Sequence, residues 1–236
     1  MVRGVMLDID GTLLLSNDAH AHAWVAAFAG CGYAVPFARV RPLIGMGGDR
    51  VLATLVPGLN DQEGDGKAIA SLRQHIFLSQ YVHTLAPAPR ARELVQRLLR
   101  EGLRLVVASS AKRGELDALL KAAQVDDLLT EATTSDEADA SKPAPDIVRA
   151  ALDKIGLATD ATLMLGDTPY DVESAGRAGV SVIAVRCGGW GDADLAGALA
   201  IYDDPADLLA HYDASPLGQQ WQGRGDQPAE QSAGLV

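Results

Sequence analysis

Four short apolar segments separated by helical patterns constrain the fold of this chain more than any other feature. The segments are residues 2–7, 103–108, 162–165 and 180–185. Each lacks the polar–apolar alternation of a half-exposed strand, so each is predicted to be a buried β-strand. The helical patterns between them are residues 88–101, 113–123, 145–155 and 169–178. This alternation predicts an α/β fold, a doubly wound parallel sheet with helices on both faces.

One stretch interrupts the alternation directly after the first strand. Residues 15–86 contain only helical patterns, at 19–30, 37–43, 50–56 and 68–83. An inserted helical block of this kind predicts a small cap domain over the edge of the sheet. We therefore expect an α/β core of residues 1–14 and 87–213 and a helical cap of residues 15–86. Residues 214–236, rich in Gly, Gln, Pro and Ser, are expected to form a disordered tail.

Charge and cysteine content exclude several classes of protein. The net charge of −11 provides no basic surface for nucleic acid. No apolar run reaches the ~20 residues that a membrane span needs, and an acidic residue comes too early for a signal peptide. Two isolated cysteines, Cys31 and Cys187, argue against disulfides or zinc and favour a cytoplasmic location. If such a protein acts on an anionic metabolite, it must supply local positive charge.

Polar residues stand where three of the predicted strands end. Asp8 follows the first strand, Ser109 the second and Asp167 the third, while the fourth leads into a loop at residues 186–190. In open parallel sheets the ligand crevice lies outside the carboxyl ends of the strands. Residues far apart in the sequence are therefore predicted to meet in one crevice.

Two of these strand ends are doubly acidic. Asp8 and Asp10 leave the first strand on the same side, and Gly11 allows a sharp turn. This pair suits a nucleophile with an acid/base neighbour, the alternative being an Asp-Gly turn that caps a loop. Asp167 and Asp171 lie one helical turn apart and suit a hard cation, whereas the alternative is favourable interaction of acids with a helix dipole.

The other two clusters could hold a phosphate group. Ser109 and Ser110 precede a predicted helix, where a hydroxyl and backbone N–H groups bind anions, or where a serine simply caps the helix. Lys142 lies in a loop stiffened by Pro143 and Pro145 and suits phosphate neutralisation, the alternative being a solvated lysine.

A cation is expected where the carboxylates meet. Asp8, Asp10, Asp167 and Asp171 would repel one another in a single crevice unless a positive ion bound there. An all-oxygen donor set without His or Cys indicates Mg²⁺ over zinc.

These residues, taken in order, resemble the motifs of the haloacid dehalogenase-like hydrolase superfamily. Residues 8–13 resemble the first motif and Ser109 the second. Lys142 resembles the third motif and residues 166–171 the fourth. The resemblance covers residues 5–189. The helical insertion is similar to the small cap of the phosphoglycolate phosphatase and β-phosphoglucomutase branch, and residues 41–49 look closest to phosphoglycolate phosphatase.

The resemblance implies a Mg²⁺-dependent phosphatase with an aspartyl-phosphate intermediate. Asp8 would attack phosphorus and bind the metal. Asp10 would protonate the leaving alcohol and then deprotonate water, with its backbone carbonyl as a metal ligand. The presence of Asp10 argues against dehalogenation, since dehalogenase members generally lack this second acid.

The resemblance also implies the remaining roles. Ser109 and the N–H of Ser110 would hold phosphate oxygens, although this Ser-Ser pair departs from the commoner Thr-Asn. Lys142 would bridge nucleophile and phosphate. Asp167 would bind Mg²⁺ directly, and Asp171 directly or through water.

Two other functions remain open at this stage. A β-phosphoglucomutase-like phosphomutase shares the motifs, and His20 with Trp24 resembles the helix start of that group. A non-catalytic binding protein on this scaffold is disfavoured because every motif residue is present.

The substrate is expected to be a small phosphorylated metabolite, such as phosphoglycolate or a sugar phosphate. His20, Asp49 and Arg50 are candidate substrate contacts. The alternative interpretations are that His20 is a surface residue and that Arg50 is a solvated charge. Residues 47–48 could equally form a plain turn between helices.

Overall fold

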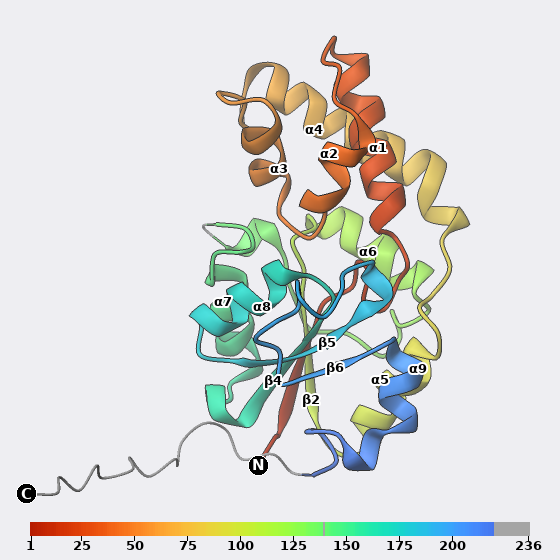
Figure 1. Ribbon diagram of the computed structural model, residues 1–236, viewed down its shortest axis with the longest axis vertical. Coiled ribbons are helices and arrows are strands. Elements are labelled where there is room, and N and C mark those ends of the chain that lie inside the picture. Colours follow the sequence, from red (N-terminus) through yellow and green to blue (C-terminus); the bar gives the residue numbers. More distant parts are fainter. Residues whose placement is uncertain (139, 220–236) are drawn as a thin grey trace, which may run out of the picture.

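A six-stranded parallel sheet forms the centre of the molecule (Figure 1). The computed structural model describes residues 1–138 and 140–219. The strands, arranged in the order β3-β2-β1-β4-β5-β6, are β1 (Gly4–Leu7), β2 (Arg104–Ala108), β3 (Ala132–Thr133), β4 (Thr162–Gly166), β5 (Ser181–Val185) and β6 (Ala200–Tyr202). Every pairing between them is parallel. The predicted α/β fold is confirmed.

The two strands that the sequence did not predict lie at the edges of the sheet. β3 has two residues and β6 has three. Segments this short show no periodicity, and short edge strands also limit unwanted pairing with other chains. The four predicted strands are the inner ones.

Helices cover both faces of the sheet. The helices of the described residues are α1 (Asn17–Gly30), α2 (Phe37–Val40), α3 (Gly48–Leu55), α4 (Gly64–Ile76), α5 (Ala91–Arg100), α6 (Arg113–Ala122), α7 (Asp146–Ile155), α8 (Pro169–Arg177) and α9 (Pro205–Ala210), of which the first four lie in residues 15–86. α7 and α8 pack on one face of the sheet and α5 on the other, with α9 against α5. Alternate strand residues serve the two faces: Met6 belongs to the apolar cluster under α7 and α8, and Val5 and Leu7 belong to the opposite one.

Several predicted helices end or begin differently in the structure. Short turns of other helix types are Arg41–Leu43, Phe77–Tyr81, Val82–Thr84, Ser135–Glu137, Thr159–Ala161, Arg186–Gly188 and Tyr212–Ala214. The helix predicted at 68–83 is thus α4 followed by a π turn and a 3₁₀ turn. α5 begins three residues later than predicted, because Pro89 disfavours helical geometry for its predecessor and Arg90 has a φ of 54°.

The helical block, residues 15–86, stands beyond the carboxyl end of β1 (Figure 1). Its two connections to the sheet lie side by side, since Leu15 N–H donates to the Ala86 carbonyl and Ala88 N–H donates to the Leu13 carbonyl. Its buried side chains, including Trp24, belong to the same apolar cluster as Leu13. The block is therefore packed against the sheet domain.

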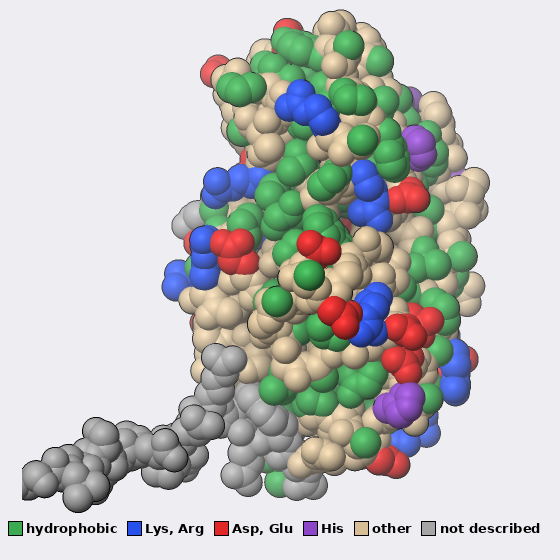
Figure 2. Space-filling view, viewed as in Figure 1, with side chains coloured by type: hydrophobic (Ala, Val, Ile, Leu, Met, Phe, Trp, Pro, Cys, Tyr) green, Lys and Arg blue, Asp and Glu red, His purple; other side chains and the backbone are tan. Residues whose placement is uncertain are grey.

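The disordered tail expected from residue 214 onward is wrong for its first residues. Ser215 and Leu217 are buried, and Ser215 N–H donates to the Tyr212 carbonyl, so residues 215–217 pack against the sheet domain. Residues 220–236 lie outside the described residues. Among the described helices, none is both long and apolar enough to span a membrane. On the face shown in Figure 2, Lys and Arg side chains lie among acidic ones and form no continuous basic surface.

Candidate active site

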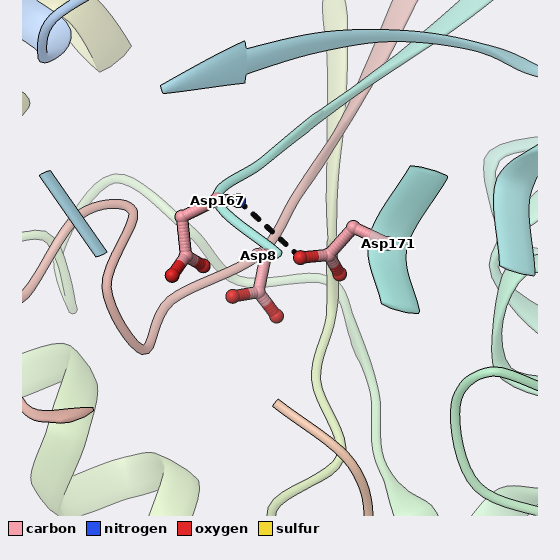
Figure 3. Close-up of side chains that lie close together, drawn as sticks. All are labelled: Asp8, Asp167 and Asp171. Carbon is pink, nitrogen blue, oxygen red and sulfur yellow. Dashed lines mark hydrogen bonds between the residues drawn. The ribbon is translucent and has the colours of Figure 1, made fainter. Parts of the chain in front are cut away.

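Three carboxylates meet at the carboxyl edge of the sheet. Asp8 follows β1 and Asp167 follows β4, and these strands are direct neighbours, with Leu7 opposite Leu165. Asp171 lies in the first turn of α8. All three are buried, and one carboxylate oxygen of each lies within 4.8 Å of the others (Figure 3). The predicted convergence of strand ends is thus present for these three residues.

The loop after β1 is shaped to let the carboxylates approach. Gly11 has a φ of +79°, and a Cβ there would overlap the Asp167 carboxylate. Thr12 Oγ1 donates to Asp167 Oδ1 at 3.1 Å, and Asn17 Nδ2 donates to Asp167 Oδ2 at 2.9 Å. Asp167 is therefore held by residues from the loop and from the start of α1.

Asp171 serves two structures at once. Its Oδ2 accepts from the N–H and hydroxyl of Thr168, at 3.0 and 2.7 Å, which completes a capping box at the start of α8. Its Oδ1 lies 2.8 Å from Lys142 Nζ. Asp171 thus lies in the first turn of α8, where an acid interacts favourably with the helix dipole, and it also belongs to the carboxylate cluster.

Lys142 is the buried cation of the site. Its side chain is 1% exposed, and Nζ donates to Asp8 Oδ1 at 2.7 Å and to the Ala108 carbonyl at 2.8 Å. Burial alone would lower the pKa of Lys142, but the charges of Asp171 and Asp8 outweigh it and raise that pKa. Lys142 is thus a fixed positive charge, and the interpretation as a solvated lysine is wrong.

The carboxylate cluster fits a divalent cation. Burial raises the pKa of Asp8 to about 7, against the opposing charge of Lys142. Burial and the nearby Asp171 and Asp8 raise the pKa of Asp167 well above its usual value. Three ionised carboxylates beside one ammonium leave a net charge of −2. A doubly charged ion with hard oxygen ligands, such as Mg²⁺, matches this donor set and charge.

The Asp10 side chain lies outside this cluster. Its Oδ1 accepts from Ser16 Oγ at 2.5 Å and lies 2.8 Å from His20 Nε2. Burial would raise the pKa of Asp10, but the charge and hydrogen bond of His20 together with Ser16 hold that pKa below its usual value. Three of the four expected carboxylates thus converge, while Asp10 lines a cavity together with Asp8 and its own carboxylate is held by Ser16 and His20.

His20 is buried on α1, where the helical block faces the sheet domain, so its interpretation as a surface residue is wrong. Its ring stacks on Phe77 with centroids 3.9 Å apart, and Nδ1 lies 3.8 Å from Glu115 Oε1. Glu115 is buried on α6 and accepts from Arg73 Nη1 of α4 at 2.7 and 2.8 Å. A polar chain therefore runs from Asp10 through His20 and Glu115 to Arg73, crossing three times between the sheet domain and the helical block.

Small cavities lie beside these residues. One of about 50 Å³ is lined by residues that include Asp8, Asp10, His20 and Ser110. A larger one of about 530 Å³ shares Trp24, Gly48 and Arg73 with it and also includes Asp49. The larger cavity is lined by residues of α4 and not by Asp8, whereas the smaller one borders the Asp8 side chain.

Of the other residues expected at the site, Ser109 is buried at the end of β2 and Arg50 is exposed away from both cavities. Ser109 is buried, and its Oγ accepts from Ala111 N–H at 3.1 Å. It is not the cap of α6, whose N-cap is Lys112. Arg50 is exposed, 3.6 Å from Asp49, and lines neither cavity, so the structure does not bring it to the site.

The loop at residues 45–48 is packed against the sheet domain, so its interpretation as a plain turn is incomplete. A Cβ on Gly45 would lie 2.7 Å from Thr168, and one on Gly47 would overlap Ser141. Glycine at these positions permits the close approach.

Arg73 and Glu115 were not predicted from the sequence. Each lies inside a predicted helix, where a charged residue is normally solvated, and only the contact between Arg73 of α4 and Glu115 of α6 reveals the pair. Arg73→Met should lower the free energy of unfolding by about 3–5 kcal/mol, because it leaves the buried Glu115 charge without its partner. Urea unfolding monitored by circular dichroism measures this change.

Two controls separate the loss of the buried Arg73–Glu115 ion pair from the effect of removing any arginine. Arg73→Met combined with Glu115→Leu should recover most of the loss, since both charges are gone. Arg92→Met, which breaks the exposed pair with Asp127, should leave stability nearly unchanged. A double variant as unstable as the single one would contradict the explanation.

Comparison with known proteins agrees with this arrangement. The family of haloacid dehalogenase-like hydrolases matches residues 5–185. The chain is 34% identical over 219 residues to phosphoglycolate phosphatase of Rhodospirillum rubrum, covering 88% of this chain and 90% of that protein. A solved hydrolase from Pseudomonas syringae is 30% identical with a TM-score of 0.83, covering 89% of this chain and 98% of that one.

A further solved structure contains phosphate. CbbY from Rhodobacter sphaeroides, in complex with phosphate, is 25% identical with a TM-score of 0.74, covering 90% of this chain and 100% of that one. The family match spans most of the chain and agrees with the relatives and with the carboxylates at the sheet edge. The chain therefore belongs to the haloacid dehalogenase-like hydrolase family.

Proposed function

We propose that this protein is a Mg²⁺-dependent phosphatase that hydrolyses a small-molecule phosphate monoester through an aspartyl-phosphate on Asp8. The observation that supports this most strongly is the buried cluster of Asp8, Asp167 and Asp171, in which Lys142 contacts Asp8 and Asp171. Similarity to phosphoglycolate phosphatase supports the class of substrate. The helical block, residues 15–86, would act as the cap that covers the reacting centre.

In the first step the Asp8 carboxylate attacks phosphorus, and the bond from phosphorus to the leaving oxygen breaks. Lys142 neutralises charge on Asp8 and on the phosphate. Asp10 gives its proton to the leaving oxygen; a bound phosphate dianion favours this protonated state by repelling a second negative charge. Mg²⁺, held by Asp8, Asp167 and Asp171 with the Asp10 carbonyl, would supply further positive charge for the phosphate oxygens.

In the second step Asp10, now ionised, takes a proton from water. The water oxygen bonds to phosphorus, the bond from phosphorus to Asp8 breaks, and inorganic phosphate leaves. The hydrogen bonds from Ser16 and His20 favour the ionised form of Asp10 and fix its direction. Ser109 and Ser110, at the end of β2, would hold phosphate oxygens.

Release of inorganic phosphate tests the proposal. Purified protein should hydrolyse p-nitrophenyl phosphate with Mg²⁺ and lose activity in a chelator. A panel including phosphoglycolate and hexose phosphates would identify the leaving group, which can extend into the 530 Å³ cavity beside Trp24. Absence of Mg²⁺-dependent release from every compound would contradict the proposal.

A phosphomutase of the β-phosphoglucomutase type is the second candidate. The buried contact between His20 and Asp10 favours it, because His20 belongs to the segment that resembles that group. A mutase needs a bisphosphate activator and returns the phosphoryl group to a sugar. Steady release of phosphate without an activator would exclude it.

Metal binding should depend on pH. The pKa of Asp8 is about 7 in the metal-free fold, against about 3.9 in an unfolded chain. Between these values the folded state holds a proton that the unfolded chain has lost, so metal-free stability falls as pH rises through the window. Because the cation displaces that proton, Mg²⁺ should raise the melting temperature more at about pH 8 than at about pH 6.

Thermal unfolding with and without Mg²⁺ at the two pH values makes this measurement. Calorimetric titration in buffers of different ionisation enthalpy would report the released proton directly. Equal Mg²⁺-induced shifts at both pH values would show that Asp8 is not protonated in the metal-free protein.

A further inference from the structure

Asn17 reaches from the helical block into the carboxylate cluster and has no part in the two steps described above. It is the first residue of α1 and is 4% exposed. Its Nδ2 donates to Asp167 Oδ2 at 2.9 Å and to the Gly188 carbonyl at 3.1 Å. One side chain thus joins α1, the loop after β5 and Asp167.

Asp167 is oriented from two directions. Its Oδ1 accepts from Thr12, which belongs to the sheet domain, and its Oδ2 accepts from Asn17 of the helical block. A Cβ on either Gly11 or Gly188 would overlap its carboxylate, so the carboxylate is tightly enclosed. Donors that orient a ligand carboxylate set the direction of its lone pairs and hence its affinity for metal.

The Asn17 amide also has an unused acceptor. Its Oδ1 is buried and has no hydrogen-bond partner among the described residues. Buried polar atoms in folded proteins are normally paired. A hard cation such as Mg²⁺ retains several water molecules. A water of this kind could donate a hydrogen bond to the buried amide oxygen of Asn17.

We propose that Asn17 is a positioning residue for Asp167, and that it links cation binding to docking of α1 against the sheet domain. This inference rests on the proposed magnesium site. If α1 moves away, Asp167 Oδ2 loses its donor and the cation site loses affinity. By reciprocity, a bound cation that favours the oriented Asp167 favours docked α1.

Three variants separate this linkage from ordinary structural support. Asn17→Ala removes the donor that comes from the helical block. Thr12→Val removes the donor that comes from the sheet domain, with little change of shape. Arg41→Ala is the control, because Arg41 donates to the same Gly188 carbonyl at 2.6 Å but belongs to neither cavity nor cluster.

The experiment measures Mg²⁺ affinity of the full chain by calorimetry and amide hydrogen exchange of α1 with and without saturating Mg²⁺. In the wild type, Mg²⁺ should slow exchange in α1. Both Asn17→Ala and Thr12→Val should weaken Mg²⁺ binding by about 10–100-fold. At saturation, Thr12→Val should regain the slow exchange of α1 and Asn17→Ala should not, while Arg41→Ala should keep wild-type affinity.

Different results would overturn this inference alone or the proposed function with it. Wild-type affinity and protection in Asn17→Ala would overturn the inference, as would equal loss of affinity in Asn17→Ala and Arg41→Ala, which would assign the effect to anchoring of Gly188. Failure of the wild type to bind Mg²⁺ would instead overturn the proposed function and the inference together. If circular dichroism shows Asn17→Ala to be unfolded, Asn17→Leu, which has a similar shape without a donor, gives the same test.

Discussion

Asp8→Asn is expected to lower the rate of phosphate release by roughly 10⁴-fold or more while leaving the fold intact. The amide has nearly the shape of the carboxylate but no charge with which to attack phosphorus. The fold should tolerate it because burial already disfavours the charged form of Asp8, whose pKa is raised to about 7. Lys142 would keep its second partner, Asp171, at 2.8 Å.

Initial rates with p-nitrophenyl phosphate and Mg²⁺ measure the loss, and circular dichroism checks the fold. Asp153→Asn is the matched control, because Asp153 is exposed on α7 and the same chemical change there should leave the rate unchanged. Near-normal turnover by Asp8→Asn would remove Asp8 from the mechanism.

Lys142→Ala is expected to lower turnover by about 10²–10³-fold. Lys142 is the buried ammonium group that touches both Asp8 and Asp171, so its loss removes positive charge where negative charge collects on the phosphate. Lys142→Met fills the same space without charge. The two variants should be similarly slow if charge is what matters, and recovery by Met alone would assign the effect to packing.

Mg²⁺ affinity distinguishes this charge effect from collapse of the site. Removing Lys142 makes the carboxylate cluster more negative, so a cation should bind at least as tightly to Lys142→Met as to the wild type. Calorimetric titration therefore predicts slow turnover with undiminished Mg²⁺ binding. Loss of Mg²⁺ binding in this variant would show that Lys142 mainly holds the carboxylates in place.

The sheet and part of the site could be predicted because they follow from local rules. The inner strands are continuous apolar runs, and parallel strands direct their carboxyl ends to one edge. That rule predicted that Asp8 and Asp167 would meet, and they do. The edge strands β3 and β6 are too short for any pattern to reveal them.

The direction of each side chain could not be predicted, because it depends on neighbours from distant segments. Asp10 lies two residues from Asp8 yet turns away from the cluster, since Ser16 and His20 offer it hydrogen bonds. The buried pair of Arg73 and Glu115 joins two helices that the sequence treats as separate amphipathic patterns. Contacts between the helical block and the sheet domain thus escape any argument from spacing alone.

Chemical trapping of Asp8 tests the central claim most directly. The protein would be mixed with Mg²⁺ and a hydrolysable phosphate ester, quenched during turnover and treated with borohydride, which reduces an acyl phosphate to an alcohol. Mass spectrometry of the peptide that contains residues 8–13 would then locate the modified residue. We expect Asp8 to become homoserine, in amounts that require both Mg²⁺ and the ester. Turnover with an unmodified Asp8, or reduction at another carboxylate, would contradict it.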